Sequence, residues 1–294
     1  TGRAALHAEV AAGLDAAWRR LGRPTVVAAC ASCLKMIRDF HPEWPAESLW
    51  TRLAAIGLPA IERTNLPTTL AIHDPCTARH DHATQAAVRA IAADLGVEVR
   101  ELGGAEHTTC CGWGGMVTYA DPVIADRIVD RRIGEDEADY LAYCAMCRDG
   151  FARRGKRTAH LLDLVFADAA AGDPAGRPDP GISRRHDARL GLQRRLMHDL
   201  WGEDMSEPTA PVRLVVPEDV RLDMERKLLL IEDAERVVAE AEASGRKLQD
   251  PATGRLVAAH RSGEVTCWVA YEPQGDGFVL RRAWSHRMRV EAKP

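Results

Sequence analysis

Five cysteines in the middle of the chain follow a spacing that few folds can accommodate. A single cysteine is followed after 33 residues by an adjacent pair, and after 32 more by a Cys-x-x-Cys pair. Adjacent cysteines bridge each other only with strain, so the pattern is poorly suited to a disulfide framework. It suits a metal centre rich in thiolate ligands, which in practice means iron–sulfur. The five residues are Cys76, Cys110, Cys111, Cys144 and Cys147.

The residues around these cysteines fit such a centre. Pro75 fixes the turn that presents Cys76. A Cys-x-x-Cys pair between a strand and a helix places both sulfurs near a helix N-terminus, which favours their anionic form. Glycines after the adjacent pair let the backbone approach an inorganic core and offer it N–H groups. These glycines are Gly112, Gly114 and Gly115.

A second Cys-x-x-Cys pair, Cys30 and Cys33, indicates an incomplete repeat of the same motif. Each such pair follows an apolar run and leads into a basic, helix-prone stretch. In the complete copy Cys111 precedes Cys144 by 33 positions, and the same step back from Cys30 falls just before residue 1. We therefore expect this chain, which starts with Thr rather than Met, to be the C-terminal part of a longer protein.

The composition restricts the cellular compartment and the classes of partner that we expect for this chain. A length of 294 residues suggests about two domains, and 46% hydrophobic residues allow a real core. The net charge of -4 argues against a nucleic-acid or membrane-surface role. No apolar run approaches the ~20 residues that span a bilayer. Seven of the eight cysteines belong to the motif pattern, which implies free thiolates in a reducing compartment, so we expect a cytoplasmic protein.

Hydrophobic periodicity in the first half of the chain predicts alternating helices and strands. We expect helices over 5–21, 82–95 and 121–133 and strands over 25–30, 66–72 and 97–102. The Asp121-Pro122 pair is a strong helix start. Strands that alternate with helices imply an α/β fold with a parallel sheet. The motif cysteines then fall at strand ends or in the loops after them, where open α/β sheets bind ligands.

The composition changes after residue 168. Residues 171–182 and 202–212 have the composition of linkers, and between them we expect a basic helix that Ser183 caps and that runs to Trp201. One helical stripe from Val220 to Ala241 and three strands then predict a small α+β domain. The predicted parts are a cysteine-rich domain at 1–168 (first-repeat tail 1–33, complete repeat 34–168), a linker with a basic helix at 169–211 and the α+β module at 212–294.

The run from His73 to Cys76, the Cys110-Cys111-Gly-Trp-Gly-Gly run and the Cys-Ala-Met-Cys pair resemble the CCG cysteine-rich domain. That domain is best known from heterodisulfide reductase, and similar copies occur in iron–sulfur subunits of glycolate, lactate and anaerobic glycerol-3-phosphate oxidation. The resemblance implies that the five cysteines bind a non-cubane [4Fe-4S] cluster. It also implies that Cys30 and Cys33 are the remnant of a first ligand motif.

The resemblance implies a heterodisulfide reductase-like oxidoreductase component, whose cluster relays electrons between a flavin partner and a disulfide or another acceptor. Residues 144–166 are also similar to bacterial FAD-dependent, dicluster-binding pyridine nucleotide-disulfide oxidoreductases. No GxGxxG fingerprint occurs here, so FAD and NAD would bind to an upstream part or a partner. We expect a flavoprotein or another redox subunit as partner, within a multi-subunit redox complex.

A zinc-stabilised, non-catalytic scaffold that binds a partner through its C-terminal module is the alternative. Zinc sites with four cysteine ligands are common, but zinc would leave one of the five thiolates without a metal. Visible absorption and metal analysis separate the two, because zinc is colourless.

The remaining candidates have ordinary structural explanations, and the sequence assigns no catalytic residue. His73 is interpreted as a satisfied histidine at a strand end, with proton supply near a cluster as the alternative. Cys267 alternates with apolar residues on one strand face and is predicted to lie in the core. The arginines of the basic helix are interpreted as a solvated face, with docking to an acidic partner as the alternative. We expect solvated side chains at His80, His82 and His107, and packing within the sheet at Trp268 and Trp284.

Overall fold

The computed structural model describes residues 4–103, 108–167, 172–205 and 212–288. The chain forms two compact units that divide between Asp179 and Pro180, and each unit has its own hydrophobic core. The predicted α/β class with a separate C-terminal sheet domain is confirmed. None of the helices in the described ranges combines the length and the apolar character needed to cross a membrane. The domain borders at residues 168 and 211 stay predictions.

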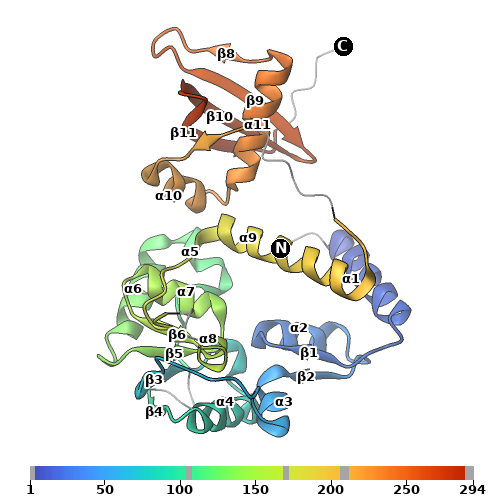
Figure 1. Cartoon of the computed structure of the whole chain (residues 1–294), viewed down its shortest axis with the longest axis vertical. Helices are drawn as coiled ribbons and strands as arrows, with labels where there is room; N and C mark the ends of the chain where they lie inside the picture. The colour runs from blue at the N-terminus through green and yellow to red at the C-terminus, as the bar shows by residue number, and fades with distance from the viewer. Residues whose placement is uncertain (1–3, 104–107, 168–171, 206–211, 289–294) are drawn as a thin grey trace. The chain divides into compact units, whose positions relative to one another are not determined.

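The first unit is built on a four-stranded parallel sheet in the order β4-β3-β5-β6 (Figure 1). Its strands are β3 (Thr69–His73), β4 (Glu98–Glu101), β5 (Tyr140–Ala142) and β6 (Thr158–His160), and the helices between them are α4 (His82–Asp94), α5 (Val117–Ala120), α6 (Pro122–Ile133) and α7 (Ala145–Arg153). From β3 the chain moves to one neighbour through α4, and from β4 it returns past β3 to β5 through α6. Because such crossovers are right-handed, α4 covers one face of the sheet and α6 and α7 cover the other.

Alternation along β3 divides the core of this unit into two layers. Leu70 and Ile72 belong to the core beneath α4, whereas Ala71 belongs to the core beneath α6 and α7. His73 lies two residues after Ala71, so its side chain is on the same face of the sheet. Its ring packs edge-on against the Phe151 ring, with 4.9 Å between the ring centroids. The alternation therefore sends His73 to the face that carries α6 and α7.

The helix starts follow from their capping residues. The Asp121 carboxylate accepts a hydrogen bond from the Ile124 N–H at 3.0 Å, and Pro122 occupies the first turn of α6, which confirms the predicted start. Asp81 caps α4 in the same way through the Thr84 N–H at 3.1 Å.

A smaller segment precedes this sheet and contains α1 (Ala4–Arg20), β1 (Val26–Ala28), α2 (Ala31–Phe40), β2 (Ala46–Ser48) and α3 (Leu49–Ile56), with β1 and β2 paired in parallel. The predicted apolar stripe of α1 is largely exposed, and Leu6, Val10 and Leu14 are 43%, 54% and 52% exposed. Trp18 is the buried residue of this helix, where it stacks on Trp44 at 5.1 Å.

The second unit contains a five-stranded sheet in the order β7-β11-β10-β9-β8, with α10 and α11 packed against it. Its elements are α9 (Gly181–Leu196) with a π-helical turn (Met197–Trp201), β7 (Leu214–Val215), α10 (Glu218–Arg226), α11 (Ile231–Ser244), β8 (Leu248–Gln249), β9 (Leu256–Ser262), β10 (Val265–Gln274) and β11 (Gly277–His286). The three predicted strands correspond to β9, β10 and β11.

Two predictions for this unit were wrong. The single helical stripe from Val220 to Ala241 is two helices, because the chain turns at Leu228, whose φ is 56°. Ser183 does not cap α9 but lies inside it, since the helix begins at Gly181 and the Ser183 hydroxyl accepts a hydrogen bond from the Ile231 N–H at 3.1 Å. For Ser183, a contact with the start of α11 replaces the expected capping bond.

Candidate metal centre

The motif cysteines surround the point where the strand order of the first sheet reverses. The neighbours of β3 are reached in opposite directions, and open α/β sheets bind ligands at the strand ends beside such a switch point. Cys76 begins a 3-10 turn (Cys76–Ala78) after β3, and Cys144 caps α7 after β5. Cys110 and Cys111 lie in the loop between β4 and α6, before a second 3-10 turn at Gly114–Met116. The predicted placement at strand ends and loops is confirmed.

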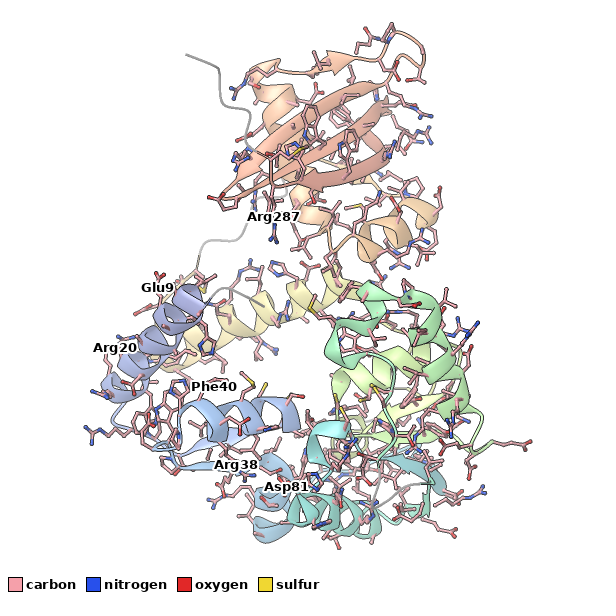
Figure 2. All side chains as sticks on the ribbon, turned by 180° about the vertical axis from the view of Figure 1, so that it is seen from behind. Glu9, Arg20, Arg38, Phe40, Asp81 and Arg287 are labelled. Atoms are coloured by element: carbon pink, nitrogen blue, oxygen red, sulfur yellow. The ribbon has the colours of Figure 1, made fainter. Side chains whose placement is uncertain are left out.

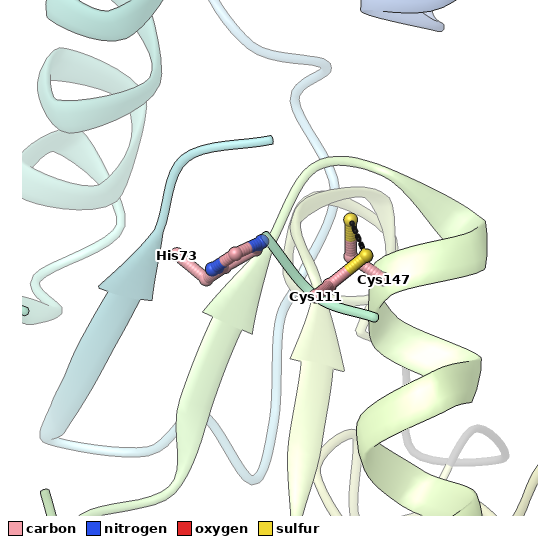
Figure 3. Close-up of side chains that lie close together, drawn as sticks. All are labelled: His73, Cys111 and Cys147. Carbon is pink, nitrogen blue, oxygen red and sulfur yellow. Dashed lines mark hydrogen bonds between the residues drawn. The ribbon is translucent and has the colours of Figure 1, made fainter. Parts of the chain in front are cut away.

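Three buried side chains from three segments meet at this point. The potential ligand atoms of His73, Cys111 and Cys147 all lie within 4.8 Å of one another. The Sγ atoms of Cys111 and Cys147 are 3.2 Å apart, and Figure 3 shows the His73 ring directed toward Cys111. A buried cluster of two soft sulfur donors and an imidazole is the composition of a transition-metal site.

Hydrogen bonds among the thiols concentrate negative charge on Cys111. Hydrogen bonds from the Cys110 and Cys147 thiols hold the pKa of Cys111 far below its ordinary value. The same bonds raise the pKa of Cys110 and that of Cys147, because each donates its proton to the Cys111 sulfur. The Gly112 N–H donates to Cys110 Sγ at 3.3 Å. The lowered pKa favours the thiolate form of Cys111, which is the form that binds metals.

The glycine after the pair is required by the space available. Gly112 has a φ of +82°, and a Cβ there would lie 2.6 Å from the Val129 side chain and 2.8 Å from the Ala125 carbonyl oxygen. The Cys-Cys-Gly loop therefore rests directly on α6, which brings Cys111 into the core beneath that helix.

His73 is held in one tautomer by a buried arginine. Arg132 donates from Nε to His73 Nδ1 at 3.1 Å, so the ring proton is on Nε2. Burial lowers the pKa of His73, which keeps the ring neutral. Its Nε2 approaches Cys111 but makes no hydrogen bond of normal geometry, and it is shielded from solvent. Arg132 also donates to the Gly103 carbonyl at 2.9 Å.

The remaining cysteines adjoin this centre. The neighbouring Cys147 side chain, helped by backbone N–H groups at the start of α7, lowers the pKa of Cys144 to about 7. Burial raises the pKa of Cys76, and so do the charges of Cys111 and Cys144. Burial is also the main cause that raises the pKa of Cys33, followed by its hydrogen bond with Cys30, and Cys144 contributes as well. The two Cys-x-x-Cys pairs are therefore close enough to interact electrostatically.

A buried aspartate anchors the strand end that carries His73 and Cys76. Asp74 forms an ion pair with Arg89 at 2.8 Å and accepts a hydrogen bond from the Tyr143 hydroxyl at 2.6 Å. These contacts join the end of β3 to α4 and to the residue after β5. Sequence reasoning missed the roles of Asp74, Arg89, Arg132 and Tyr143, because no spacing rule relates residues so far apart in the chain.

A cleft of about 350 Å³ opens beside Cys76. It lies between α2 and the turn after β3, and its wall includes Arg38, Arg79 and Asp81. Figure 2 shows Arg38 and Asp81 pointing toward one another, in a contact of 3.4 Å. The cleft gives small molecules a route to the cysteine-bearing turn.

The comparisons with known proteins agree with this geometry. The profile of the CCG family, described as a cysteine-rich domain, matches residues 70–152. Lactate utilization protein A of Geobacillus kaustophilus (strain HTA426) is 32% identical over 171 residues, which cover 48% of this chain and 70% of the relative. The chain belongs to the CCG cysteine-rich domain family. Membership of this family and the relative indicate an iron–sulfur, redox-related function.

The CCG match runs from β3 to α7 and includes all five cysteines of the complete motif. Cys30 and Cys33 lie outside it, yet they occupy the same local structure, because Cys30 caps α2 after β1 as Cys144 caps α7 after β5. The Cys30 sulfur accepts a hydrogen bond from the Cys33 N–H at 3.4 Å.

The residues of this CCG protein fit a metal or cluster. The donors are soft sulfur atoms, neighbouring thiols lower the pKa of Cys111, and the buried Nε2 of His73 has no hydrogen-bond partner beside them. Cys76, Cys110, Cys111, Cys144 and Cys147 would hold the group, and it would supply one-electron chemistry.

The other residues singled out from the sequence lie away from this centre. Cys267 is buried in the core of the second unit, and the Trp268 and Trp284 rings stack at 6.0 Å. His80 is exposed, and the His82 ring is 3.2 Å from the Gln85 side-chain oxygen. His107 lies outside the described residues.

Proposed function

We propose that this CCG protein is an iron–sulfur electron-transfer component of the heterodisulfide reductase type. Its cluster, a non-cubane [4Fe-4S] centre, would be bound by Cys76, Cys110, Cys111, Cys144 and Cys147. It would pass electrons between a flavoprotein or other redox subunit and a disulfide or another acceptor. We also propose a cytoplasmic, multi-subunit redox complex as its setting, with any FAD or NAD on another part of that complex.

The meeting of Cys111 and Cys147 with His73 at the sheet switch point carries this proposal. These residues are far apart in sequence, yet their ligand atoms lie within 4.8 Å of one another and are buried. Hydrogen bonds from neighbouring thiols lower the pKa of Cys111, and a positively charged metal would stabilise its thiolate form further.

Residues around the proposed cluster site would have separate roles. Burial beneath α6 and α7 excludes water from Cys111 and Cys147. Arg132 holds the His73 ring neutral, with its Nε2 proton aimed at the sulfur side. The cleft beside Cys76 admits an acceptor, and its arginines favour an anionic one. Reduction of a disulfide there consumes two electrons and two protons and yields two thiols.

Cys30 and Cys33 would serve a second centre whose other ligands come from a preceding segment or a partner. Their position beside Cys144 supports this role, because the charge of Cys144 raises the pKa of Cys33. A chain with one complete motif would then show little disulfide reductase turnover alone, since each electron needs its own cluster.

Anaerobic reconstitution with iron and sulfide tests the proposal. We expect iron and acid-labile sulfide in the amount of one cluster per chain, with broad visible absorption that dithionite bleaches and a one-electron oxidant restores. Stoichiometric zinc in protein purified anaerobically, with no uptake of iron, would refute it.

A zinc-stabilised scaffold is the second candidate, and one observation favours it. The closest group of potential ligands is Cys111, Cys147 and His73, a mixed sulfur and nitrogen set of the kind that zinc binds. In that case His73→Ala should remove a ligand and release the metal, whereas in a cluster held by five cysteines the variant should still take up one cluster's worth of iron, with lower affinity.

A further inference from the structure

A cleft of about 380 Å³ lies within the C-terminal unit, where the CCG centre has no part. It is bounded by the turn between α10 and α11 and by residues at the ends of β9, β10 and β11. Its apolar wall is formed by Leu228, Leu229, Val265 and Cys267, and the rest of the lining is polar. A concave site with an apolar wall and a few polar groups is the usual form of a small-molecule site.

Three cationic side chains from separate elements surround this cleft. They are Lys227 after α10, Arg236 on α11 and Arg287 after β11, the last of which is labelled in Figure 2. Lys227 already has partners, because it forms an ion pair with Asp223 and donates a hydrogen bond to the Ala283 carbonyl oxygen at 3.2 Å. Arg236 and Arg287 have no ion pair or side-chain hydrogen bond with any residue in the described ranges. Two guanidinium groups at one cleft thus lack an anion.

The acidic groups near this cleft already have hydrogen-bond partners. Asp233 lines the cleft, but its carboxylate accepts a hydrogen bond from the Leu230 N–H at 3.3 Å and caps α11. Glu240 lies 2.5 Å from the ring of His260, another lining residue. Neither carboxylate pairs with Arg236 or Arg287, so the cleft holds these two guanidinium groups together with the charge of Asp233.

The backbone of the cleft wall is strained at a residue that the sequence would place in a helix. Leu228 has a φ of 56°, a left-handed conformation that strains the backbone of a leucine. No glycine or proline explains the break between α10 and α11. The break brings Lys227 to the cleft and leaves Leu228 exposed on its wall. Strain of this kind is concentrated at ligand sites.

We propose that this cleft binds a small organic phosphate. Guanidinium groups bind phosphate oxygens in pairs, and two of them from different elements match a tetrahedral dianion better than a single planar carboxylate. A cleft of about 380 Å³ is larger than inorganic phosphate needs, so the apolar wall formed by Leu229 and Val265 would contact the organic part. The site would give the C-terminal unit a ligand-binding role separate from the redox centre.

Calorimetric titration of the full chain with phenyl phosphate at fixed ionic strength tests this proposal. We expect saturable binding, weaker binding of inorganic phosphate and of benzoate, and no binding of phenol. Arg236→Ala and Arg287→Ala should each weaken phenyl phosphate binding by about tenfold or more, because each removes charge-assisted hydrogen bonds. Arg246→Ala removes an exposed arginine outside the cleft and should bind as the unaltered chain does.

Three results would overturn the proposal. The first is no heat of binding with phenyl phosphate at millimolar concentration. The second is equal affinity in the unaltered chain and in Arg236→Ala and Arg287→Ala. The third is equal weakening by Arg246→Ala, which would indicate a general charge effect. Circular dichroism of each variant checks folding, and Arg236→Lys, which keeps the charge without the planar fork, should recover only part of the affinity.

Discussion

Arg132 donates a hydrogen bond from Nε to Nδ1 of His73 across 3.1 Å in the buried core of the first unit. This single contact decides which ring nitrogen carries the proton, because arginine has no acceptor to offer. The ring proton of His73 is therefore on Nε2, the nitrogen that faces the Cys111 sulfur. Arg132 lies 59 residues from His73 in the sequence, and it determines that the His73 ring presents an N–H donor toward Cys111.

We expect His73→Phe and Arg132→Met to weaken metal binding by about 10- to 100-fold, as is typical for residues that support ligands. Loss of the N–H directed at sulfur should also lower the midpoint potential of a bound cluster. Competition with a chelator and redox titration measure the two effects. His198→Gln, at an exposed histidine of the second unit, is the control and should change neither quantity. An unchanged potential in both core variants would contradict this role for His73.

The cysteine assignment predicts a clear division among single substitutions. Cys110→Ser and Cys111→Ser should abolish iron and sulfide incorporation, since both sulfurs are proposed direct ligands. Cys267→Ser should leave the iron content unchanged, because Cys267 lies in the core of the other unit. Iron and acid-labile sulfide analysis after reconstitution measures the outcome. Loss of iron from Cys267→Ser would show that the eighth cysteine belongs to the centre.

Gly112→Ala should destabilise the metal-free chain, whereas Gly114→Ala should not. An alanine at 112 must adopt a φ of +82° and place its Cβ 2.6 Å from Val129, so we expect a loss of at least about 1–3 kcal/mol. The same substitution at 114 meets no atom within 4 Å. Urea denaturation compares the two variants, and equal stabilities would mean that the loop rests less closely on α6 than described.

Asp74→Ala should cost more stability than Glu101→Ala, although both remove a partner of Arg89. The Asp74 side chain is 4% exposed, and loss of one member of a buried pair costs about 3–5 kcal/mol. The Glu101 side chain is 49% exposed, and such pairs contribute less than about 1 kcal/mol. Denaturant unfolding at neutral pH measures both values. Equal losses would mean that Tyr143 and the buried environment add nothing to the role of Asp74.

Glu232 should make the second unit less stable as the pH rises. Burial, with the nearby Asp187 carboxyl group, raises the pKa of Glu232 from its ordinary value of 4.5 to about 7. The folded state then holds this proton more tightly than the unfolded state. The stability it contributes is present below pH 4.5 and is lost as the pH rises to about 7. The nearby Glu235, whose pKa burial also raises, adds to the trend.

Thermal unfolding of the full chain between pH 4.5 and 8 measures this effect. We expect Glu232→Gln to flatten the pH dependence and to raise the unfolding temperature above pH 7. Glu203→Gln, at an exposed position, should follow the unaltered chain. A steep dependence that persists in Glu232→Gln would assign the effect to other groups.

The sequence predicted those parts of the fold and site that depend on local rules. The Asp121-Pro122 cap, the strand ends at the cysteines and the three strands of the second unit all follow from neighbouring residues. The short strands β2 and β6 carry too few residues for a periodic signal, and they were missed. The break at Leu228 has no local cause, and the Arg132–His73 contact joins residues on different elements. The break at Leu228 and the Arg132–His73 contact depend on tertiary packing, which local sequence patterns do not report.

The polar contacts that position the cysteine loops use no sulfur. Asp74, Arg89, Tyr143 and the Arg132–His73 pair hold the ends of β3 and β5 in place through oxygen and nitrogen atoms alone. The scaffold of the site and its proposed ligands are therefore different sets of side chains. A substitution in one set can be tested for its effect on the fold, and a substitution in the other for its effect on metal content.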